Sequence, residues 1–143
     1  MSERGAHFRR TALFSLATLL VLVVILIVQF RDLPGSVSAS EARELFAIDS
    51  SVVILDVRTR EEFSGEAGHL QRAILIPVQE LERRIDELGP WKGRTIVVYC
   101  RSGRRSLNAA TLLGRKGYKA LNLEGGILEW HSRNYPVLVE KVK

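Results

Sequence analysis

The stretch that decides the fold is residues 95–116, which read TIVVYCRSGRRSLNAATLLGRK. Its first five residues, Thr95–Tyr99, are mostly β-branched and aromatic, in a run too short for a helix and typical of a buried strand. A cysteine and a basic, glycine-containing loop follow, and residues 106–116 predict a helix that ends at Gly117. A buried strand joined to a helix by a short loop is typical of α/β folds with a parallel sheet.

The same alternation of strand and helix extends in both directions from this segment. Continuous apolar runs predict three further strands, at residues 51–57, 73–76 and 119–123. Capping residues and apolar periodicity predict three further helices, at residues 41–47, 79–88 and 125–133. Ser40 is expected to cap the first of these helices. The fold class is therefore α/β, with a parallel sheet covered by helices on both faces.

The N-terminal part has a different character, because residues 11–30 (TALFSLATLLVLVVILIVQF) contain no charged side chain. A helix of this length would span roughly 30 Å, the hydrocarbon thickness of a bilayer. The expected organisation is a basic tail over 1–10, a transmembrane helix over 11–30, a linker over 31–38 and a soluble domain over 39–143. A cleaved signal peptide is the alternative, since Val37-Ser38-Ala39 resembles a cleavage site.

The charges that flank this segment predict its orientation. Arg4, Arg9 and Arg10 precede it, whereas Arg31 and Arg43 follow it. Because positive charge is retained in the cytoplasm, the domain is expected outside the cytoplasm, with the cytoplasmic face as the alternative. The expected location is thus a single-pass membrane protein that contacts the lipid bilayer through residues 11–30.

Composition excludes several classes of protein. The chain has 21 Lys and Arg against 16 Asp and Glu, and this modest excess does not predict a nucleic-acid partner. A single cysteine excludes an intramolecular disulfide and a cysteine-rich zinc site. His7, His69 and His131 lack the spacing of metal ligands, so no metal is expected.

The single cysteine, Cys100, directly follows the strand at 95–99. In parallel α/β sheets the ligand site lies beyond this carboxyl end of the strands. Loop amides, the N-terminus of the next helix and the charges of Arg101, Arg104 and Arg105 would each favour a thiolate. The residues therefore predict a nucleophilic cysteine with a lowered pKa, against the alternative of a buried inert thiol.

The loop Cys100-Arg-Ser-Gly-Arg-Arg-Ser106 resembles the active-site loop of single-domain rhodanese-like sulfurtransferases. Three further stretches resemble signatures of that family: Leu55-Asp-Val-Arg58 with Glu61-Glu62-Phe63, Gly68-His69 with Ala73-Ile-Leu-Ile-Pro77, and a closing segment from Gly117-Tyr118 through Asn122-Leu-Glu-Gly-Gly126 and Trp130 to Tyr135-Pro136. The resemblance covers residues 38–143. It implies a rhodanese-like, five-stranded parallel sheet flanked by helices.

The resemblance also implies an activity, in which Cys100 moves sulfane sulfur from a thiosulfate-like donor to a thiol, cyanide or protein acceptor. No cofactor is expected, because the intermediate is a persulfide on Cys100 itself. The expected substrate-binding residues are those of the loop: Arg101, Ser102, Gly103, Arg104 and Arg105, of which Arg105 is alternatively a brace. The expected supporting residues are Asp56, Arg58, Glu62 and His69, with Asp56 or Glu62 paired to Arg58. A non-catalytic docking module and a persulfide carrier for a protein partner are the alternatives.

Two details of the sequence refine this hypothesis. A phosphatase on the same fold needs a longer Cys-x5-Arg loop around a tetrahedral oxyanion, and Ser106 stands at that arginine position. Gln71-Arg72 stand where the family typically has Pro-Gly, which changes a turn and one expected rim of the cleft.

Overall fold

The computed structural model describes residues 18–26 and 34–139, and the chain divides into two units, Met1–Leu33 and Pro34–Lys143. In the first unit, residues 18–26 are helical and their apolar side chains are exposed. No helix among the described residues is long and apolar enough to cross a membrane.

This finding contradicts the expected transmembrane helix over residues 11–30. The predictions of a single-pass membrane protein, of lipid contact and of a domain outside the cytoplasm are corrected with it. The rest of the expected span and the basic tail at 1–10 lie outside the described residues.

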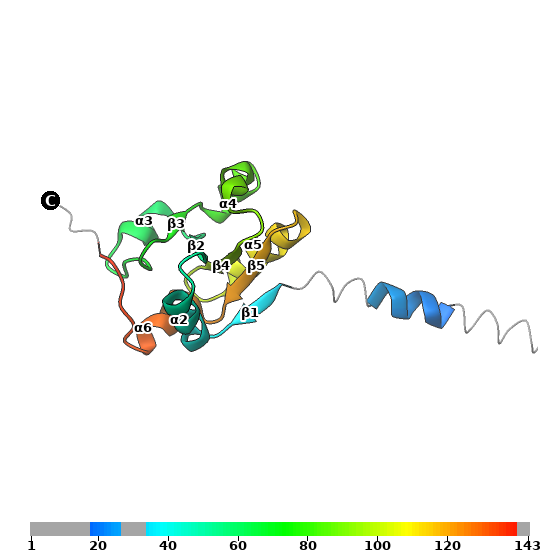
Figure 1. Cartoon of the computed structure of the whole chain (residues 1–143), viewed down its shortest axis with the longest axis horizontal. Coiled ribbons are helices and arrows are strands. Elements are labelled where there is room, and N and C mark those ends of the chain that lie inside the picture. The colour runs from blue at the N-terminus through cyan, green and yellow to red at the C-terminus, as the bar shows by residue number, and fades with distance from the viewer. Residues whose placement is uncertain (1–17, 27–33, 140–143) are drawn as a thin grey trace, which may run out of the picture. The chain divides into compact units, whose positions relative to one another are not determined.

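The second unit is built on a five-stranded sheet with the order β1-β5-β4-β2-β3 (Figure 1). The strands are β1 (Gly35–Val37), β2 (Val53–Asp56), β3 (Ile74–Leu75), β4 (Thr95–Tyr99) and β5 (Lys119–Leu123). Every neighbouring pair is parallel, which confirms the expected five-stranded parallel sheet. The central strand is β4, so the residue that follows it, Cys100, lies at the middle of the sheet's carboxyl edge.

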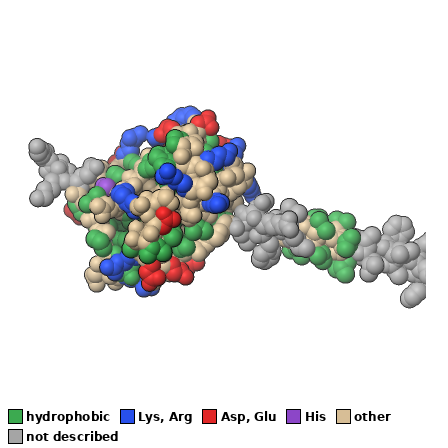
Figure 2. Space-filling view, viewed as in Figure 1, with side chains coloured by type: hydrophobic (Ala, Val, Ile, Leu, Met, Phe, Trp, Pro, Cys, Tyr) green, Lys and Arg blue, Asp and Glu red, His purple; other side chains and the backbone are tan. Residues whose placement is uncertain are grey.

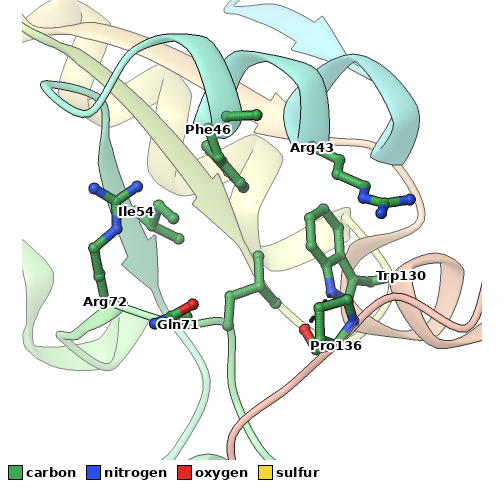
Figure 3. Close-up of a pocket in the computed structure, with 9 residues that line it drawn as sticks. Arg43, Phe46, Ile54, Gln71, Arg72, Trp130 and Pro136 are labelled. Atoms are coloured by element: carbon green, nitrogen blue, oxygen red, sulfur yellow. Dashed lines mark hydrogen bonds between the residues drawn. The ribbon is translucent and has the colours of Figure 1, made fainter.

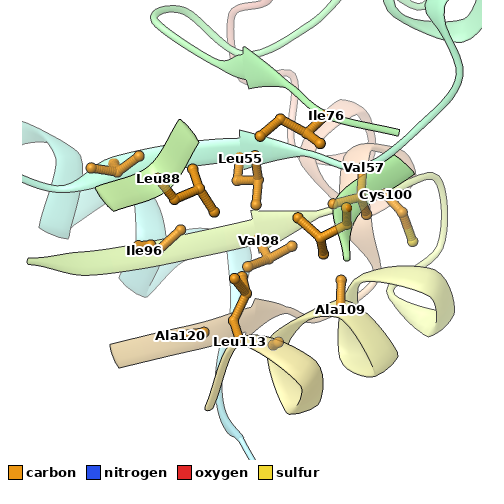
Figure 4. Close-up of a cluster of buried hydrophobic side chains, with 13 residues drawn as sticks. Leu55, Val57, Ile76, Leu88, Ile96, Val98, Cys100, Ala109, Leu113 and Ala120 are labelled. Carbon is orange, nitrogen blue, oxygen red and sulfur yellow. The ribbon is translucent and has the colours of Figure 1, made fainter. Parts of the chain in front are cut away.

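Helices cover both faces of this sheet. They are α2 (Ala39–Ile48), α3 (Arg60–Ser64), α4 (Val78–Leu81), the 3₁₀ helix η1 (Ile85–Trp91), α5 (Arg104–Arg115) and α6 (Gly126–Ser132). One cluster of buried side chains lies between the sheet and the helices α2 and α6, which contact each other (Figure 1). The other cluster joins α4, η1 and α5 to the opposite face (Figure 4).

Alternation along β4 assigns its side chains to these two clusters. Val97 and Tyr99 belong to the cluster under α2 and α6, whereas Ile96, Val98 and Cys100 belong to the cluster under α5. Because successive side chains of a strand point to opposite faces, the period of two places the Cys100 thiol on the α5 face. On the face shown in Figure 2, exposed Lys and Arg side chains are interspersed with Asp and Glu.

Four local features differ from the sequence expectation. Residues 35–37, placed in the linker, form the edge strand β1, which pairs with β5. Ser38, not Ser40, caps α2 through a reciprocal capping box with Glu41. The helix expected over 79–88 is divided into α4 and a 3₁₀ segment that contains Pro90, although Leu81 and Leu88 are buried as its periodicity required. Helix α3, which the sequence analysis did not identify, begins at a second capping box between Thr59 and Glu62.

Candidate active site

The site is built on a sharp turn between β4 and α5. At Gly103 the backbone takes φ +92, a left-handed conformation that glycine adopts without steric cost. A Cβ atom at this position would lie 3.1 Å from the backbone nitrogen of Gly125, which is closer than side chains normally approach. Any other residue at position 103 would therefore strain this turn.

The start of α6 holds this turn from the other side. The backbone nitrogens of Ile127 and Leu128 donate to the carbonyl oxygens of Cys100 and Arg101, at 2.9 and 3.1 Å. Gly126 has φ +57, and a Cβ there would collide with the same two carbonyl oxygens. The double glycine of the closing sequence motif thus lets a second helix N-terminus pack directly against the cysteine loop.

Cys100 is almost fully buried, with 1% of its surface exposed. Its Sγ accepts a hydrogen bond from the backbone nitrogen of Gly103 at 3.2 Å and lies 3.4 Å from the Ser106 hydroxyl oxygen. Burial raises the pKa of the thiol, but hydrogen bonds from the Ser106 side chain and from the backbone amides of Ser106, Ser102 and Gly103 outweigh it. The pKa of Cys100 is therefore lower than that of an ordinary cysteine.

The three arginines of the loop contribute less to this lowering than their number suggests. Arg105 forms two hydrogen bonds of 2.7 Å with the Glu62 carboxylate, so its charge is balanced and α5 is joined to α3. The hydrogen bonds from Arg105 hold the pKa of Glu62 at about 2, although burial of the carboxyl opposes them. Arg101 and Arg104 are exposed and form no ion pair among the described residues. The lowered pKa of Cys100 is thus caused mainly by hydrogen bonds from Ser106 and the loop amides, and Arg105, which also interacts with Cys100, contributes less.

A buried ion pair supports the neighbouring strand end. Arg58 lies against Asp56 at 2.7 Å, with both side chains almost fully buried, and donates to the Gly68 carbonyl oxygen at 2.7 Å. The Tyr99 hydroxyl accepts from the backbone nitrogen of Leu70 at 3.1 Å. Burial raises the pKa of Tyr99, so this hydroxyl stays neutral. Of the two partners that the sequence left open for Arg58, the structure places Asp56 beside it.

His69 lies in the same supporting region. Its ring stacks on Phe63 with 3.8 Å between ring centroids, and its Nδ1 lies 3.1 Å from the Leu70 carbonyl oxygen. Its backbone exchanges two hydrogen bonds of 2.8 Å with Leu138, which ties the loop after α3 to the C-terminal segment. These contacts support a structural role for His69, as the sequence analysis expected.

Two residues near the sulfur had no assigned role at the sequence level. They are Ser106, whose hydroxyl lies within hydrogen-bond distance of Cys100 Sγ, and Asn122 of β5. The Oδ1 atom of Asn122 lies 2.7 Å from the Ser106 hydroxyl oxygen. Both occur in the motifs quoted above, but 16 residues separate them, and only the adjacent packing of β4, β5 and α5 brings them together.

Comparison with known proteins agrees with this geometry. Residues 38–133 match the sequence model of the Rhodanese-like domain. The chain belongs to the rhodanese-like family. A sulfurtransferase of Allochromatium vinosum is 32% identical over 105 residues, which cover 73% of this chain and 94% of that protein. The thiosulfate sulfurtransferase PspE of Escherichia coli is 40% identical over 73 residues, covering 51% and 68% of the two chains.

Solved structures show the same fold. The crystal structure of a rhodanese-related protein from Thermoplasma volcanium superposes with a TM-score of 0.67 at 30% identity, covering 74% of this chain and 99% of the other. Its relatives include proteins named as sulfurtransferases and one named as a putative sulfur carrier, so the rhodanese-like domain described here is related to proteins that bind or transfer sulfur.

A cavity of about 270 Å³ lies beside the cysteine loop of this rhodanese-like domain. Its lining combines the exposed Leu128 and the buried Ile127 of α6 with Arg101 of the loop and with Glu62 and Ala67 from the opposite side. The wall thus combines apolar side chains with four charged residues, Arg58, Glu62, Glu66 and Arg101.

A second cavity, of about 170 Å³, lies on the other face of the sheet (Figure 3). Its lining includes Phe46, Ile54 and Trp130, which belong to the cluster under α2 and α6. Arg72 also lines it and has φ +64, a left-handed conformation that a glycine would adopt without strain. The departure from the family's Pro-Gly pair therefore modifies this cavity, and none of its lining residues belongs to the cysteine loop.

Proposed function

We propose that this protein is a sulfurtransferase in which Cys100 accepts sulfane sulfur from a thiosulfate-like donor and passes it to a nucleophilic acceptor. The observation that supports this most strongly is the set of donors around the sulfur: loop amides and the Ser106 hydroxyl. Hydrogen bonds to the anionic form lower the pKa of Cys100, which raises the fraction of the nucleophilic thiolate at a given pH.

In the first step the Cys100 thiolate attacks the outer sulfur of the donor. A bond forms between Sγ and this sulfur, the donor's S–S bond breaks, and sulfite leaves with the bonding electron pair. Cys100 then carries a persulfide, and no external oxidant is required. Arg101 and Arg104, exposed at the loop, would attract a dianionic donor.

In the second step the acceptor attacks the outer sulfur of the persulfide. Cyanide or a thiolate forms the new bond, the S–S bond to Cys100 breaks, and the thiolate is restored. The donors that lower the pKa of Cys100 also make it a better leaving group, because they stabilise the charge that returns to Sγ. One set of hydrogen bonds thus assists both half-reactions.

The cavity beside the loop supplies a place for the acceptor. The cavity of about 270 Å³ is lined by Arg101, the neighbour of Cys100, and its volume would accommodate a small thiol or one protruding cysteine side chain of a partner protein. Sulfur delivery to a protein therefore stays the second candidate function, and a purely docking role is the third.

Intact-mass measurement of the full chain tests these alternatives. After incubation with thiosulfate, we expect one added sulfur, which is lost on addition of cyanide with release of thiocyanate. Cys100→Ser should show neither event. Transfer activity in Cys100→Ser would overturn the mechanism, and absence of any added sulfur in the parent protein would favour a docking module. Release of the sulfur to a protein thiol but not to cyanide would identify a carrier.

A further inference from the structure

The Ser106 hydroxyl lies close to three hydrogen-bond acceptors but can donate to one of them at a time. Its oxygen lies 2.7 Å from Asn122 Oδ1, 3.1 Å from the Gly103 carbonyl oxygen and 3.4 Å from Cys100 Sγ. A hydroxyl carries one hydrogen and can direct it to one of these acceptors at a time. Ser106, Cys100 and Asn122 are all buried, so solvent is poorly placed to supply the missing donor.

Asn122 is able to resolve this competition, because its carboxamide has an acceptor at one end and a donor at the other. With Oδ1 towards Ser106, as in the structure, the amide accepts the hydroxyl hydrogen and draws it away from the sulfur. A rotation of the amide by 180° places Nδ2 at the same point. Nδ2 then donates to the Ser106 oxygen, and the hydroxyl hydrogen is free for the Gly103 carbonyl oxygen or for Cys100 Sγ, of which a negatively charged Sγ is the stronger acceptor.

We infer that Asn122 is a positioning residue whose amide orientation follows the charge on Cys100. It accepts from Ser106 while Cys100 is a neutral thiol. It donates to Ser106 when Cys100 is a thiolate, so that the hydroxyl hydrogen points at the charged Sγ. The inference rests on the proposed function only in taking Cys100 as the reacting group, and its test measures thiol ionisation, so it can fail while sulfur transfer stands.

The other charges near the sulfur do not duplicate this effect. They are the Arg105–Glu62 pair between α5 and α3, the buried Arg58–Asp56 pair at the end of β2, and the exposed Arg101 and Arg104 of the loop. Since the pKa of Glu62 is about 2, the nearest of these pairs keeps its charges throughout the range in which a cysteine ionises. Only the Ser106 hydroxyl can redirect a hydrogen towards the sulfur as that charge changes.

A double-mutant cycle tests the link between Asn122 and the sulfur. In Asn122→Asp the carboxylate can only accept, so it retains the Ser106 hydrogen and should raise the pKa of Cys100, measured from alkylation rate against pH. Repulsion between the new carboxylate and the thiolate also raises this pKa, but it does so equally when Ser106 is replaced by alanine. We therefore expect Asn122→Asp to raise the pKa by about one unit more in the parent than in Ser106→Ala. Equal increases in the two backgrounds would overturn the inference.

A second measurement leaves Asn122 unchanged and does not depend on the stability of the aspartate variant. In ¹⁵N-labelled full-length protein, the side-chain amide resonances of Asn122 should shift with pH at the midpoint found for Cys100. In Ser106→Ala this shift should be lost, whereas a direct effect of the thiolate charge would persist. The exposed Asn108 of α5 is the matched control and should not follow Cys100. Asn122 resonances that stay constant through the ionisation of Cys100 would contradict the proposal.

Discussion

Replacing Glu62 with glutamine tests whether Arg105 stabilises the fold through its pairing with Glu62. The pKa of Glu62 is lowered from 4.5 to about 2 chiefly by the Arg105 hydrogen bonds, and each pKa unit corresponds to about 1.4 kcal/mol. That difference sets an upper bound of about 3.4 kcal/mol, which must be reduced because both side chains are about one-third exposed and screened by solvent. We expect Glu62→Gln to lower the free energy of unfolding by about 1–2 kcal/mol at pH 7.

The pH dependence gives this prediction its sign. A carboxyl group whose pKa is depressed on folding contributes stability above its unfolded pKa, here 4.5, and loses it as the pH falls towards about 2. The difference in urea stability between parent and Glu62→Gln should therefore be constant from pH 7 to about 5.5 and shrink below pH 4.5.

Glu61→Gln is the matched control, because Glu61 is the exposed neighbour on the same helix turn and does not contact Arg105. Urea denaturation followed by tryptophan fluorescence measures both variants. A Glu62→Gln difference that is absent at pH 7, or that does not shrink on acidification, would refute the assignment of Arg105 to bracing α3.

Three further predictions concern the loop and the departure at Arg72. Ser106→Ala should raise the pKa of Cys100 by about one unit, because the thiolate loses a hydrogen bond, and alkylation rates against pH would detect it. Arg101→Ala should raise KM for thiosulfate and leave kcat nearly unchanged if this exposed cation binds the donor's ground state; an unchanged KM would leave Arg101 without a role in donor binding. Arg72→Gly should increase the free energy of unfolding, measured by urea denaturation, by about 0.5–1 kcal/mol, because relief of the left-handed strain at Arg72 exceeds the added entropy of the unfolded chain. A decrease would show that the contacts of the Arg72 side chain outweigh this strain.

The fold was predictable where a single strand or helix carries its own pattern. The bounds of β4 and β5 match the expected residues, and β4 in particular is a run of β-branched and aromatic side chains. In contrast, β1 is three residues long and largely exposed, so no apolar run marks it, and it exists because it pairs with β5. Helix α3 did have a sequence signal, the Thr59–Glu62 capping box, which could have revealed it.

The site was predictable in its position but not in its physical cause. A cysteine after a central strand and before a glycine-containing loop is sufficient to place Cys100 at the carboxyl edge of the sheet. The spacing of Arg101, Arg104 and Arg105 indicates positive charge, but it cannot show that Glu62, 43 residues before Arg105, balances one of these charges. Pairings of this kind depend on which helices the fold brings together, and that information lies outside any local motif.

Neutral donors suit this chemistry better than a balanced or distant cation, since the sulfur must change its charge during each transfer. Cys100 would have to be stabilised as a thiolate before attack, be uncharged at Sγ once the new S–S bond forms, and regain the charge when the acceptor leaves with the sulfur. A fixed cation beside Sγ would favour the anion at every stage and would hinder the steps that consume it. Backbone amides are neutral donors, and the Ser106 hydroxyl has three acceptors within reach of its single hydrogen. Such a hydroxyl can donate to Sγ when the sulfur is charged and to another acceptor when it is not. The pairing of Arg105 with Glu62 then has a second consequence, because the Glu62 carboxylate offsets part of the charge of this guanidinium, which also interacts with Cys100.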